Sequence, residues 1–164
     1  YSNMANYTGA NVITTSDVLK YQPDAFDFGI STTATETTNF LAQTTNDILR
    51  QLRIEWWSVY KTNVFTDITV LNTAEMDNTK VNLDQFERAG IYLFLGRFYL
   101  PALTKFRPET EKDRFERMSE YYMSEYNKEW RSILEDGVEY DATADGTIQV
   151  SEREPLHGYR RLTR

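Results

Sequence analysis

The longest amphipathic pattern in the chain, residues 110–136, limits most strongly what this sequence folds into. Apolar and aromatic side chains recur there at steps of three and four residues, whereas the other positions are mostly Glu, Lys, Arg, Asp and Ser. Thr110 is the expected N-cap, and Gly137 suits the position after the last turn. We predict one long helix that packs its apolar stripe on a core. The stripe consists of Phe115, Met118, Tyr122, Tyr126, Trp130 and Ile133 or Leu134.

Two further stretches predict the rest of a mainly α protein, a bundle of three to four helices. Residues 33–60 repeat apolar side chains on one helical face, and residues 83–100 are apolar on nearly all sides. A helix of the second kind is the buried centre of a helical domain. Gly90 and Gly96 each cost it about 1 kcal/mol relative to Ala, so we expect the backbone of another helix to approach closely. Pro101 is expected to kink or end it.

Shorter signals lie between these helices. Ser16 is the expected N-cap of a short helix that stops before Pro23. Residues 26–30 are expected to be extended or a loop, and residues 61–81 a loop with one short strand or helical turn. Asn82 is expected to cap the central helix, with Gln85 at the capping-box position.

The sequence after Gly137 changes from a helical to a β-like pattern. Residues 138–140 and 147–150 are predicted to be two strands of a hairpin around an Asp145-Gly146 turn. A lone hairpin is marginally stable, so it needs the body or a neighbouring subunit to lie on. We therefore expect one helical domain over residues 1–150, with a flexible N-terminal arm and this C-terminal hairpin. Residues 151–164 have no periodicity and are expected to be an extended docking tail.

Composition excludes several classes of function. The 164 residues include no cysteine, which excludes disulfides and thiolate metal sites. The longest apolar runs are too short to cross a membrane, and the first residues do not resemble a secretory signal. The net charge is −7, with the negative charge in residues 1–150, where 14 basic residues face 23 acidic ones. Such a body argues against a dedicated nucleic-acid binder but suits a surface that DNA passes without sticking.

No catalytic motif is recognisable. His157 is the only histidine, and neither a nucleotide-binding glycine loop nor a G-x-S-x-G sequence is present. Glu116 with Glu120, and Glu125 with Glu129, share a helix face but lack the Glu-x-x-His sequence of di-iron bundles, so we interpret them as solvated. We expect no catalytic, cofactor or metal site, and a protein that is not an enzyme. An enzyme using carboxylates and a divalent metal stays a minor alternative.

Asp141, Asp145 and Gly146 share a few features with the calcium-binding loop of EF-hand proteins. We interpret them as an ordinary turn, on the premise that the spacing fails the EF-hand pattern and that no glutamate stands at its twelfth position.

Some residues are candidates for contacts with other molecules. Trp57 and Tyr121 each sit in a pair of adjacent aromatic residues on a predicted helix, so one member of each pair faces the core. The other member is either part of the rim of the core or an anchor at a subunit interface. The cluster of Arg160, Arg161 and Arg164 is a solvated terminus, a docking element for an acidic groove of a partner, or a contact to DNA phosphate.

The order of these features resembles the head-to-tail adaptor proteins of tailed bacteriophages, also called connector or head-completion proteins. The resemblance rests on FLAQTTNDILRQLRIEWW, on FERMSEYYMSEYNKEWRSILEDG, and on the ending GYRRLTR. It is architectural, covers roughly residues 30–164, and includes no signature motif. Two long helices surround an apolar central one, and a glycine, a hairpin and an Arg-containing tail follow.

The resemblance implies a non-enzymatic virion protein at the head-tail interface, assembled in the host cytoplasm. It implies a ring, usually dodecameric, that joins the portal protein to a downstream tail or neck protein and lets genomic DNA pass without specific binding. The implied portal-docking residues are Arg153, Leu156, Tyr159, Arg160, Arg161, Leu162 and Arg164. The implied subunit-interface residues are Val138, Tyr140, Ile148, Val150, Trp57 and Tyr121. The alternative function is a soluble helical protein-protein interaction or regulatory module.

Overall fold

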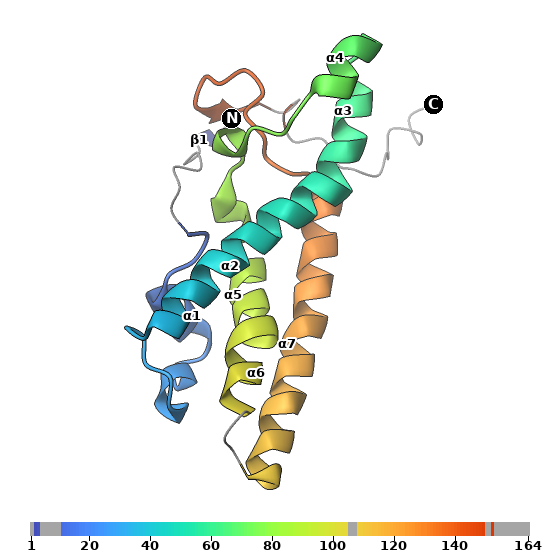
Figure 1. The fold of residues 1–164 in the computed structure, drawn as a ribbon. Helices are drawn as coiled ribbons and strands as arrows, with labels where there is room; N and C mark the ends of the chain where they lie inside the picture. The colour runs from blue at the N-terminus through green and yellow to red at the C-terminus, as the bar shows by residue number, and fades with distance from the viewer. Residues whose placement is uncertain (1, 4–10, 105–107, 150–151, 153–164) are drawn as a thin grey trace. The chain divides into compact units, whose positions relative to one another are not determined.

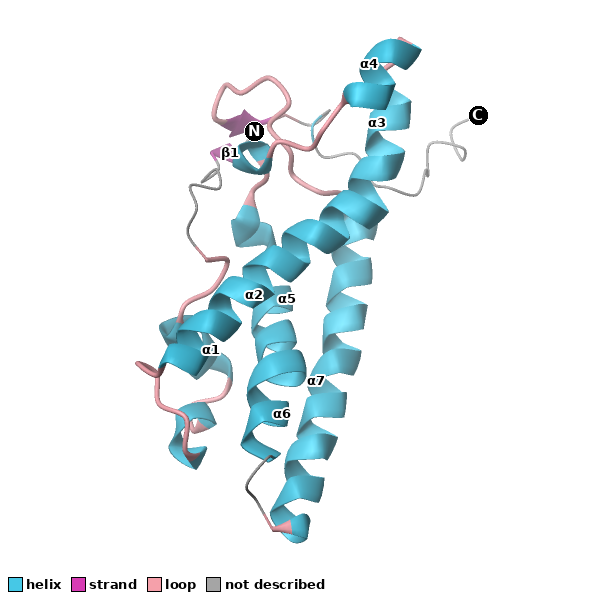
Figure 2. Cartoon of the chain, viewed as in Figure 1, coloured by secondary structure: helices cyan, strands magenta, loops and turns pink. Residues whose placement is uncertain are grey.

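The computed structural model describes residues 2–3, 11–104, 108–149 and 152. Most of them are helical, as Figure 2 shows, which confirms the predicted mainly α class. None of the helices in the described part of the chain combines the length and the hydropathy needed to cross a bilayer.

The chain divides into two compact units. Unit 1 contains residues 1–10, 47–85 and 131–164, and unit 2 contains residues 11–46 and 86–130. Helices α2 (Thr35–Leu52) and α7 (Glu109–Asp136) each begin in unit 2 and end in unit 1. The sequence predicts a single helical domain, because nothing in its local pattern indicates that the chain leaves unit 1 and returns to it.

Unit 2 is built around a pair of helices. Helix α5 (Glu87–Leu93), a π-helical turn (Phe94–Tyr99) and α6 (Leu100–Leu103) follow one another without a break and form the predicted central helix. In Figure 1 this helix lies alongside α7. Helix α1 (Thr15–Tyr21) and a 3₁₀ turn (Ala25–Phe28) complete the unit with the first part of α2.

The core of unit 2 is almost entirely apolar. The ring of Phe26 packs 5.1 Å from that of Tyr99, and the Tyr99 hydroxyl donates a 2.7 Å hydrogen bond to the carbonyl of Ile30. These contacts fix the 26–30 segment as the end of the 3₁₀ turn and a loop, so the extended alternative that the sequence left open is wrong. The buried members of this core are Ile13, Val18, Ala25, Leu41, Ile91, Phe94, Leu95, Tyr99, Leu100, Leu103, Phe115 and Tyr122.

Gly96 is where the central helix meets α7 closely. A Cβ built at Gly96 would lie 2.9 Å from the backbone nitrogen of Met123, and the Ser119 hydroxyl donates a hydrogen bond to the Gly96 carbonyl. Only glycine leaves room for this approach, because a Cβ contact below 3.0 Å forces a backbone to shift. The expectation that Gly96 serves a close helix contact is confirmed.

Pro101 does not end the central helix. The helix continues as α6 to Leu103, with Pro101 in the first turn of that element. Proline has no N–H to donate to the preceding turn, and the turn before it is widened to π-helical hydrogen bonding.

The first helix begins at a different cap from the predicted one. Thr14, rather than Ser16, is the N-cap of α1, and Ser16 lies inside the helix. The Thr14 hydroxyl accepts from the N–H of Asp17, whose carboxylate accepts from the N–H of Thr14 at 2.9 Å. The helix begins at Thr14 because Thr14 has an acidic partner at the third helical position and can form this reciprocal capping box. Ser16 lacks such a partner.

Unit 1 contains more helix than predicted. The predicted helix over 33–60 continues from α2 through a π-helical turn (Arg53–Trp57) and α3 (Ser58–Val64), past its expected end, and α4 (Ile68–Thr73) lies in the predicted loop 61–81. Two 3₁₀ turns cover Asn78–Lys80 and Leu83–Phe86. The extra turns within 61–81 begin at Asp67 and Asp77, whose carboxylates accept from the N–H groups of Thr69 and Thr79, both at 2.9 Å.

The predicted C-terminal hairpin has one of its strands but is wrong in its pairing. Strand β2 (Thr147–Ile148) pairs antiparallel with β1 (Ser2–Asn3), which lies beside the loop that carries β2 in Figure 1. The other predicted strand does not join it: Tyr140 instead forms an antiparallel bridge with Val81. The hairpin fails because residues 141–146 fold around the Asp141 carboxylate and do not form a two-residue turn.

Candidate metal centre

Three carboxylates of unit 1 come together in the loop of residues 141–152. Asp141, Asp145 and Glu152 each place one oxygen within 4.8 Å of the others. Asp141 is 0% exposed and Glu152 6% exposed, whereas Asp145 is open to solvent. The loop begins directly after the buried Tyr140, a few residues after the end of α7 at Asp136. It is the one place in the described residues where side chains converge in a metal-binding set.

The spacing of these residues matches the calcium loop of EF hands. With Asp141 as the first position, Asp145 is the fifth, Gly146 the sixth and Glu152 the twelfth. The premise that the twelfth position lacks a glutamate is therefore wrong, and it concealed Glu152. The signal that finds this residue is a count of twelve from Asp141.

The third and ninth positions depart from the most common residues but keep oxygen. Thr143 stands third, where Asp or Asn is usual, and offers a hydroxyl oxygen. Gln149 stands ninth, a position that often binds the metal through water. All the side-chain donors of the loop are thus hard oxygen atoms, the donor type that suits calcium or magnesium and not zinc or copper.

The backbone of the loop turns sharply at two residues. Gly146 has a φ of 83° and Ala144 a φ of 57°, both in the left-handed region. A Cβ at Gly146 would meet nothing within 4 Å, so glycine is required there for its backbone conformation and not for space. The turn directs the N–H groups of Asp145 and Gly146 to the two oxygens of Asp141, at 3.2 and 2.9 Å.

Glu152 closes the loop from its other end. One carboxylate oxygen accepts from the Thr143 N–H and the other from the Gln149 N–H, each at 2.9 Å. The Thr143 hydroxyl also contacts the Glu152 oxygen, at 3.1 Å, and Asp141, at 3.3 Å. The side chain of Glu152 therefore reaches back across the loop toward Asp141, where a metal ligand at the twelfth position has to lie.

Asp145, the exposed member, is held as a carboxylate. The Thr147 N–H and hydroxyl donate to one of its oxygens at 2.9 and 2.8 Å. These hydrogen bonds lower the pKa of Asp145 below its usual value of 3.8. The group is thus ionised at neutral pH and carries the negative charge that a divalent cation requires.

An aromatic cluster fixes the start of the loop. The ring of Tyr140 lies 5.4 Å from that of Trp56, 5.5 Å from Trp57 and 5.6 Å from Tyr60. Burial raises the pKa of the Tyr140 hydroxyl, which accepts a hydrogen bond from the N–H of Asp77 at 3.2 Å. Asp141 therefore follows a side chain that is held on several sides.

Backbone hydrogen bonds hold both ends of the loop in place. The Asp141 N–H donates to the Lys80 carbonyl at 2.8 Å, and the Tyr140 N–H donates to the Glu152 carbonyl at 3.3 Å. The loop is therefore closed at its base by the same chain segments that form the Val81–Tyr140 bridge.

Gln85 binds the segment that precedes the loop. Its amide donates to the Gly137 carbonyl at 2.7 Å, and its oxygen accepts from the Glu139 N–H at 3.0 Å. Gln85 therefore holds the chain after α7, in place of the predicted capping box, while Asn82 accepts from the Asp84 N–H as a cap.

The predicted interface residues fall into three groups. Val138, Tyr140, Ile148 and Trp57 are buried within this chain. Tyr121 is 59% exposed on α7, next to the buried Tyr122. Val150 and the docking set Arg153, Leu156, Tyr159, Arg160, Arg161, Leu162 and Arg164 lie outside the described residues.

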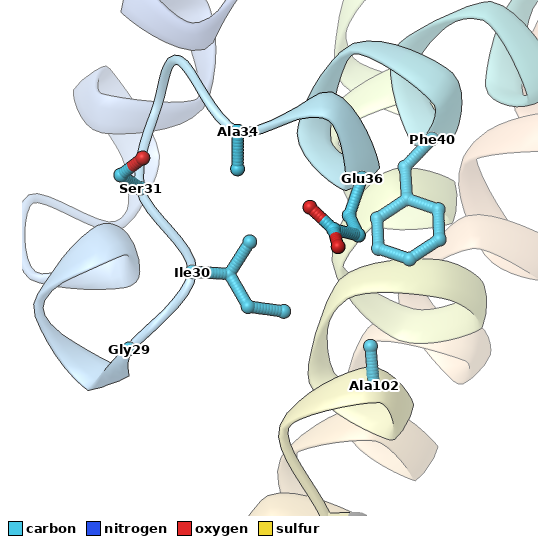
Figure 3. A pocket seen from close by; sticks show the side chains of 7 residues that line it. All are labelled: Gly29, Ile30, Ser31, Ala34, Glu36, Phe40 and Ala102. Carbon is cyan, nitrogen blue, oxygen red and sulfur yellow. The ribbon is translucent and has the colours of Figure 1, made fainter.

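Two pockets in the described residues offer different chemistry. One, of about 410 Å³ in unit 2, is lined mainly by small and apolar groups, with Glu36 as its single carboxylate. Figure 3 shows Ile30 pointing from its loop toward Glu36 and Phe40 on α2. The other, of about 430 Å³ in unit 1, lies between Arg53, Lys61 and Glu75. Neither lining contains a Ser, Cys or Lys nucleophile beside a histidine base.

Neither a protein-family model, nor a curated protein, nor a solved structure matches this chain.

Proposed function

We propose that this chain is a non-enzymatic structural protein of a tailed-phage virion, a ring-forming adaptor between the portal and the tail. The observation that carries the proposal is the anchoring of Glu152. This buried residue is bonded through its side chain to Thr143 and Gln149 and through its carbonyl to Tyr140. The Arg-containing segment 153–164 therefore starts from a fixed point on a folded body, as a docking tail requires.

The tail recognises its partner by charge and by apolar contact. Residues 153–164 carry four arginines and one glutamate on a chain whose net charge is −7. Arginine forms paired hydrogen bonds with carboxylates, so the proposed partner surface is an acidic groove of the portal protein with apolar pockets for Leu156, Tyr159 and Leu162.

The ring contacts are assigned to exposed apolar side chains of the body. Four of the residues first expected at the interface are buried in this chain, so they have little surface for a neighbour. Unit 1 instead exposes apolar side chains on and next to its short helices, where a solvated helix would be polar. These are Ile54, Val59, Val64, Ile68 and Val70. Tyr121 on α7 offers a further aromatic contact from unit 2.

Negative charge on the body suits the passage of DNA. Residues 1–150 hold 23 acidic and 14 basic residues, and DNA phosphates bind to clusters of basic ones. A ring of such subunits repels the polyanion and does not retain it during ejection.

A truncation series tests the docking tail. The full chain and a variant ending at Glu152 are each co-expressed with the portal protein of the same phage, and complexes are counted by pull-down and electron microscopy. The full chain is expected to form rings on the portal, and the shortened chain to fold with unchanged circular dichroism but not to dock. A matched control replaces Arg160, Arg161 and Arg164 with Lys. It keeps the charge but not the paired hydrogen bonds, so it should dock more weakly than the full chain.

Two outcomes contradict the proposal. If the shortened chain still docks, residues 153–164 are not the segment that binds the portal. A full chain that stays monomeric at every concentration and with every portal protein tested favours the alternative, a helical interaction or regulatory module.

A further inference from the structure

We propose that the loop of residues 141–152 binds one calcium ion, with Asp141, Thr143, Asp145 and Glu152 as side-chain ligands and the Thr147 carbonyl as a backbone ligand. This metal site shares Glu152 with the anchor of the proposed docking tail, but calcium binding does not depend on the proposed adaptor function. Two independent observations point to it: a pair of buried carboxylates without a cationic partner among the described residues, and the sequence register.

The buried charge comes first. Asp141 and Glu152 are more than nine-tenths buried, and no lysine, arginine or histidine of the described residues forms an ion pair with either. Their hydrogen bonds come from neutral N–H and hydroxyl groups, which leave the two negative charges in place. Buried carboxylates in proteins are neutralised by a cationic side chain, a proton or a metal. A divalent cation placed among Asp141, Asp145 and Glu152 supplies that charge.

The sequence register is the second observation and does not depend on the fold. The twelve-residue register has Asp at positions one and five, Gly at six and Glu at twelve. Ile148 stands at the eighth position. An ordinary turn with a carboxylate cluster does not demand a glutamate six residues after the glycine. A calcium loop does, because the twelfth residue provides two oxygens to the ion.

Calcium is favoured over magnesium by the same set of donors. The loop offers side-chain oxygens from both of its ends and a carboxylate that can bind through two oxygens, which suits the higher coordination number of calcium. Magnesium requires nearly octahedral geometry and releases its water reluctantly. Only three of the ligands are charged, so the affinity is expected to be below that of loops with four or five carboxylates.

The surroundings of the loop indicate what calcium binding does. The loop connects the Val81–Tyr140 bridge to β2, which pairs with Ser2–Asn3. Bringing three carboxylates within 4.8 Å costs repulsion that the ion removes. Calcium therefore stabilises unit 1 and its strand pair, and it does so through binding to the folded state only.

The test is a titration of the full chain with calcium chloride, in which binding is measured by isothermal titration calorimetry and by thermal unfolding. A titration with magnesium chloride is carried out in parallel. Terbium luminescence gives a third readout, because Trp56 and Trp57 pack on Tyr140 next to the first ligand. One calcium per chain is expected, bound at least tenfold more tightly than magnesium. At a calcium concentration about a hundredfold above Kd, the unfolding midpoint should rise by about 5 °C or more.

Two variants locate the site. Glu152→Gln removes the charge of the closing ligand and is expected to weaken calcium binding at least tenfold. Asp145→Asn changes an exposed ligand, so it preserves folding even if Glu152→Gln does not, and it is expected to weaken binding several-fold. The controls Asp84→Asn and Glu135→Gln make the same changes at exposed carboxylates outside the loop and should bind as the parent does.

Three outcomes decide against the assignment or part of it. A flat titration with no shift of the unfolding midpoint up to about 10 mM calcium, well above the Kd of the weakest sites of this class, overturns the site. Equal responses to calcium and magnesium overturn the calcium identity. Unchanged binding by both loop variants shows that the metal binds elsewhere. Portal docking is not measured in any of these experiments, so their failure leaves the adaptor proposal as it stands.

Discussion

The core of unit 2 and the carboxylates of Asp141 and Glu152 in unit 1 are both buried, but opposite interactions hold them. In unit 2, apolar side chains such as Phe94 and Ile91 fill the space between helices, and Gly96 lets two backbones approach. In the loop, backbone N–H groups surround the carboxylates of Asp141 and Glu152. The first arrangement is stable without any further component, whereas the second accumulates negative charge.

Because of this difference, the stability of the two units should respond to different conditions. Apolar packing does not require a bound ion, and its loss upon substitution increases with the volume removed. Carboxylate clusters depend on counter-ions and on pH. Experiments that change one condition at a time therefore separate the two regions.

The largest effect is expected in the apolar core. Phe94→Ala removes a ring that is 0% exposed and stacks 5.5 Å from Tyr99, so it should cost about 3–5 kcal/mol of unfolding free energy. Urea denaturation measures the loss, which should be the same in calcium and in chelator. A loss that disappears with added calcium would break the separation between the two regions.

High pH should destabilise unit 2 next. Burial raises the pKa of Tyr99 to about 12 from its ordinary value of 10.0. The neutral phenol is the form that the folded state favours, so its contribution is complete below pH 10 and is lost as the pH rises through 12. A shift of this size corresponds to about 2–3 kcal/mol.

The control for the pH experiment is Tyr99→Phe. It gives up the hydrogen bond to Ile30, so it should be less stable at neutral pH by about 1 kcal/mol. Its stability should then fall less steeply between pH 10 and 12, as followed by urea denaturation at each pH. Parallel curves for the two proteins would assign the alkaline loss to other tyrosines.

Overpacking of the helix contact should have an intermediate effect. Gly96→Ala places a methyl group 2.9 Å from the backbone nitrogen of Met123, so it should cost about 1–3 kcal/mol by thermal or urea unfolding. The double variant with Met123→Ala serves as the control. It should not recover the loss, because the closest clash is with backbone and not with the methionine side chain.

The smallest effect is expected at the other glycine. Gly146→Ala meets no atom within 4 Å but forces alanine to a φ of 83°, which costs about 1–2 kcal/mol. Gly146→Asn should cost less, because asparagine tolerates this conformation. Thermal unfolding with and without calcium sharpens the comparison: the Gly146 variants should lose part of the calcium response, and the Gly96 variant none of it.

Local patterns predict the helices well. Helix α7 spans Glu109–Asp136, against the predicted 110–136, because its apolar period and Gly137, with a φ of 109°, act within a few residues. The close contact at Gly96 was also predictable, since a glycine inside an apolar helix has a packing reason. Long-range pairing was not: the Ser2–Ile148 contact has no signal in either segment, so the hairpin prediction chose the nearest strand.

The metal centre shows a different kind of miss. The residues that define it can be read from the sequence, and only a count from Asp141 to Glu152 was needed. What gives the count its weight is the burial of Asp141 and Glu152, together with the contacts of Tyr140 with Trp56 and Trp57, which lie far from it in the sequence. Such a convergence becomes visible only in the fold.

The three-segment composition of unit 1 has a consequence for biosynthesis. Unit 2 is complete once residue 130 has left the ribosome, whereas unit 1 also needs residues 131–164 in addition to 1–10 and 47–85. Strand β1 is synthesised before β2 and has to wait for it before the two pair. Contacts between distant segments form slowly. Unit 2 should therefore fold during translation, and the loop of residues 141–152 only after its last residues are made. The unit whose segments lie farthest apart in the sequence is thus the last to take shape.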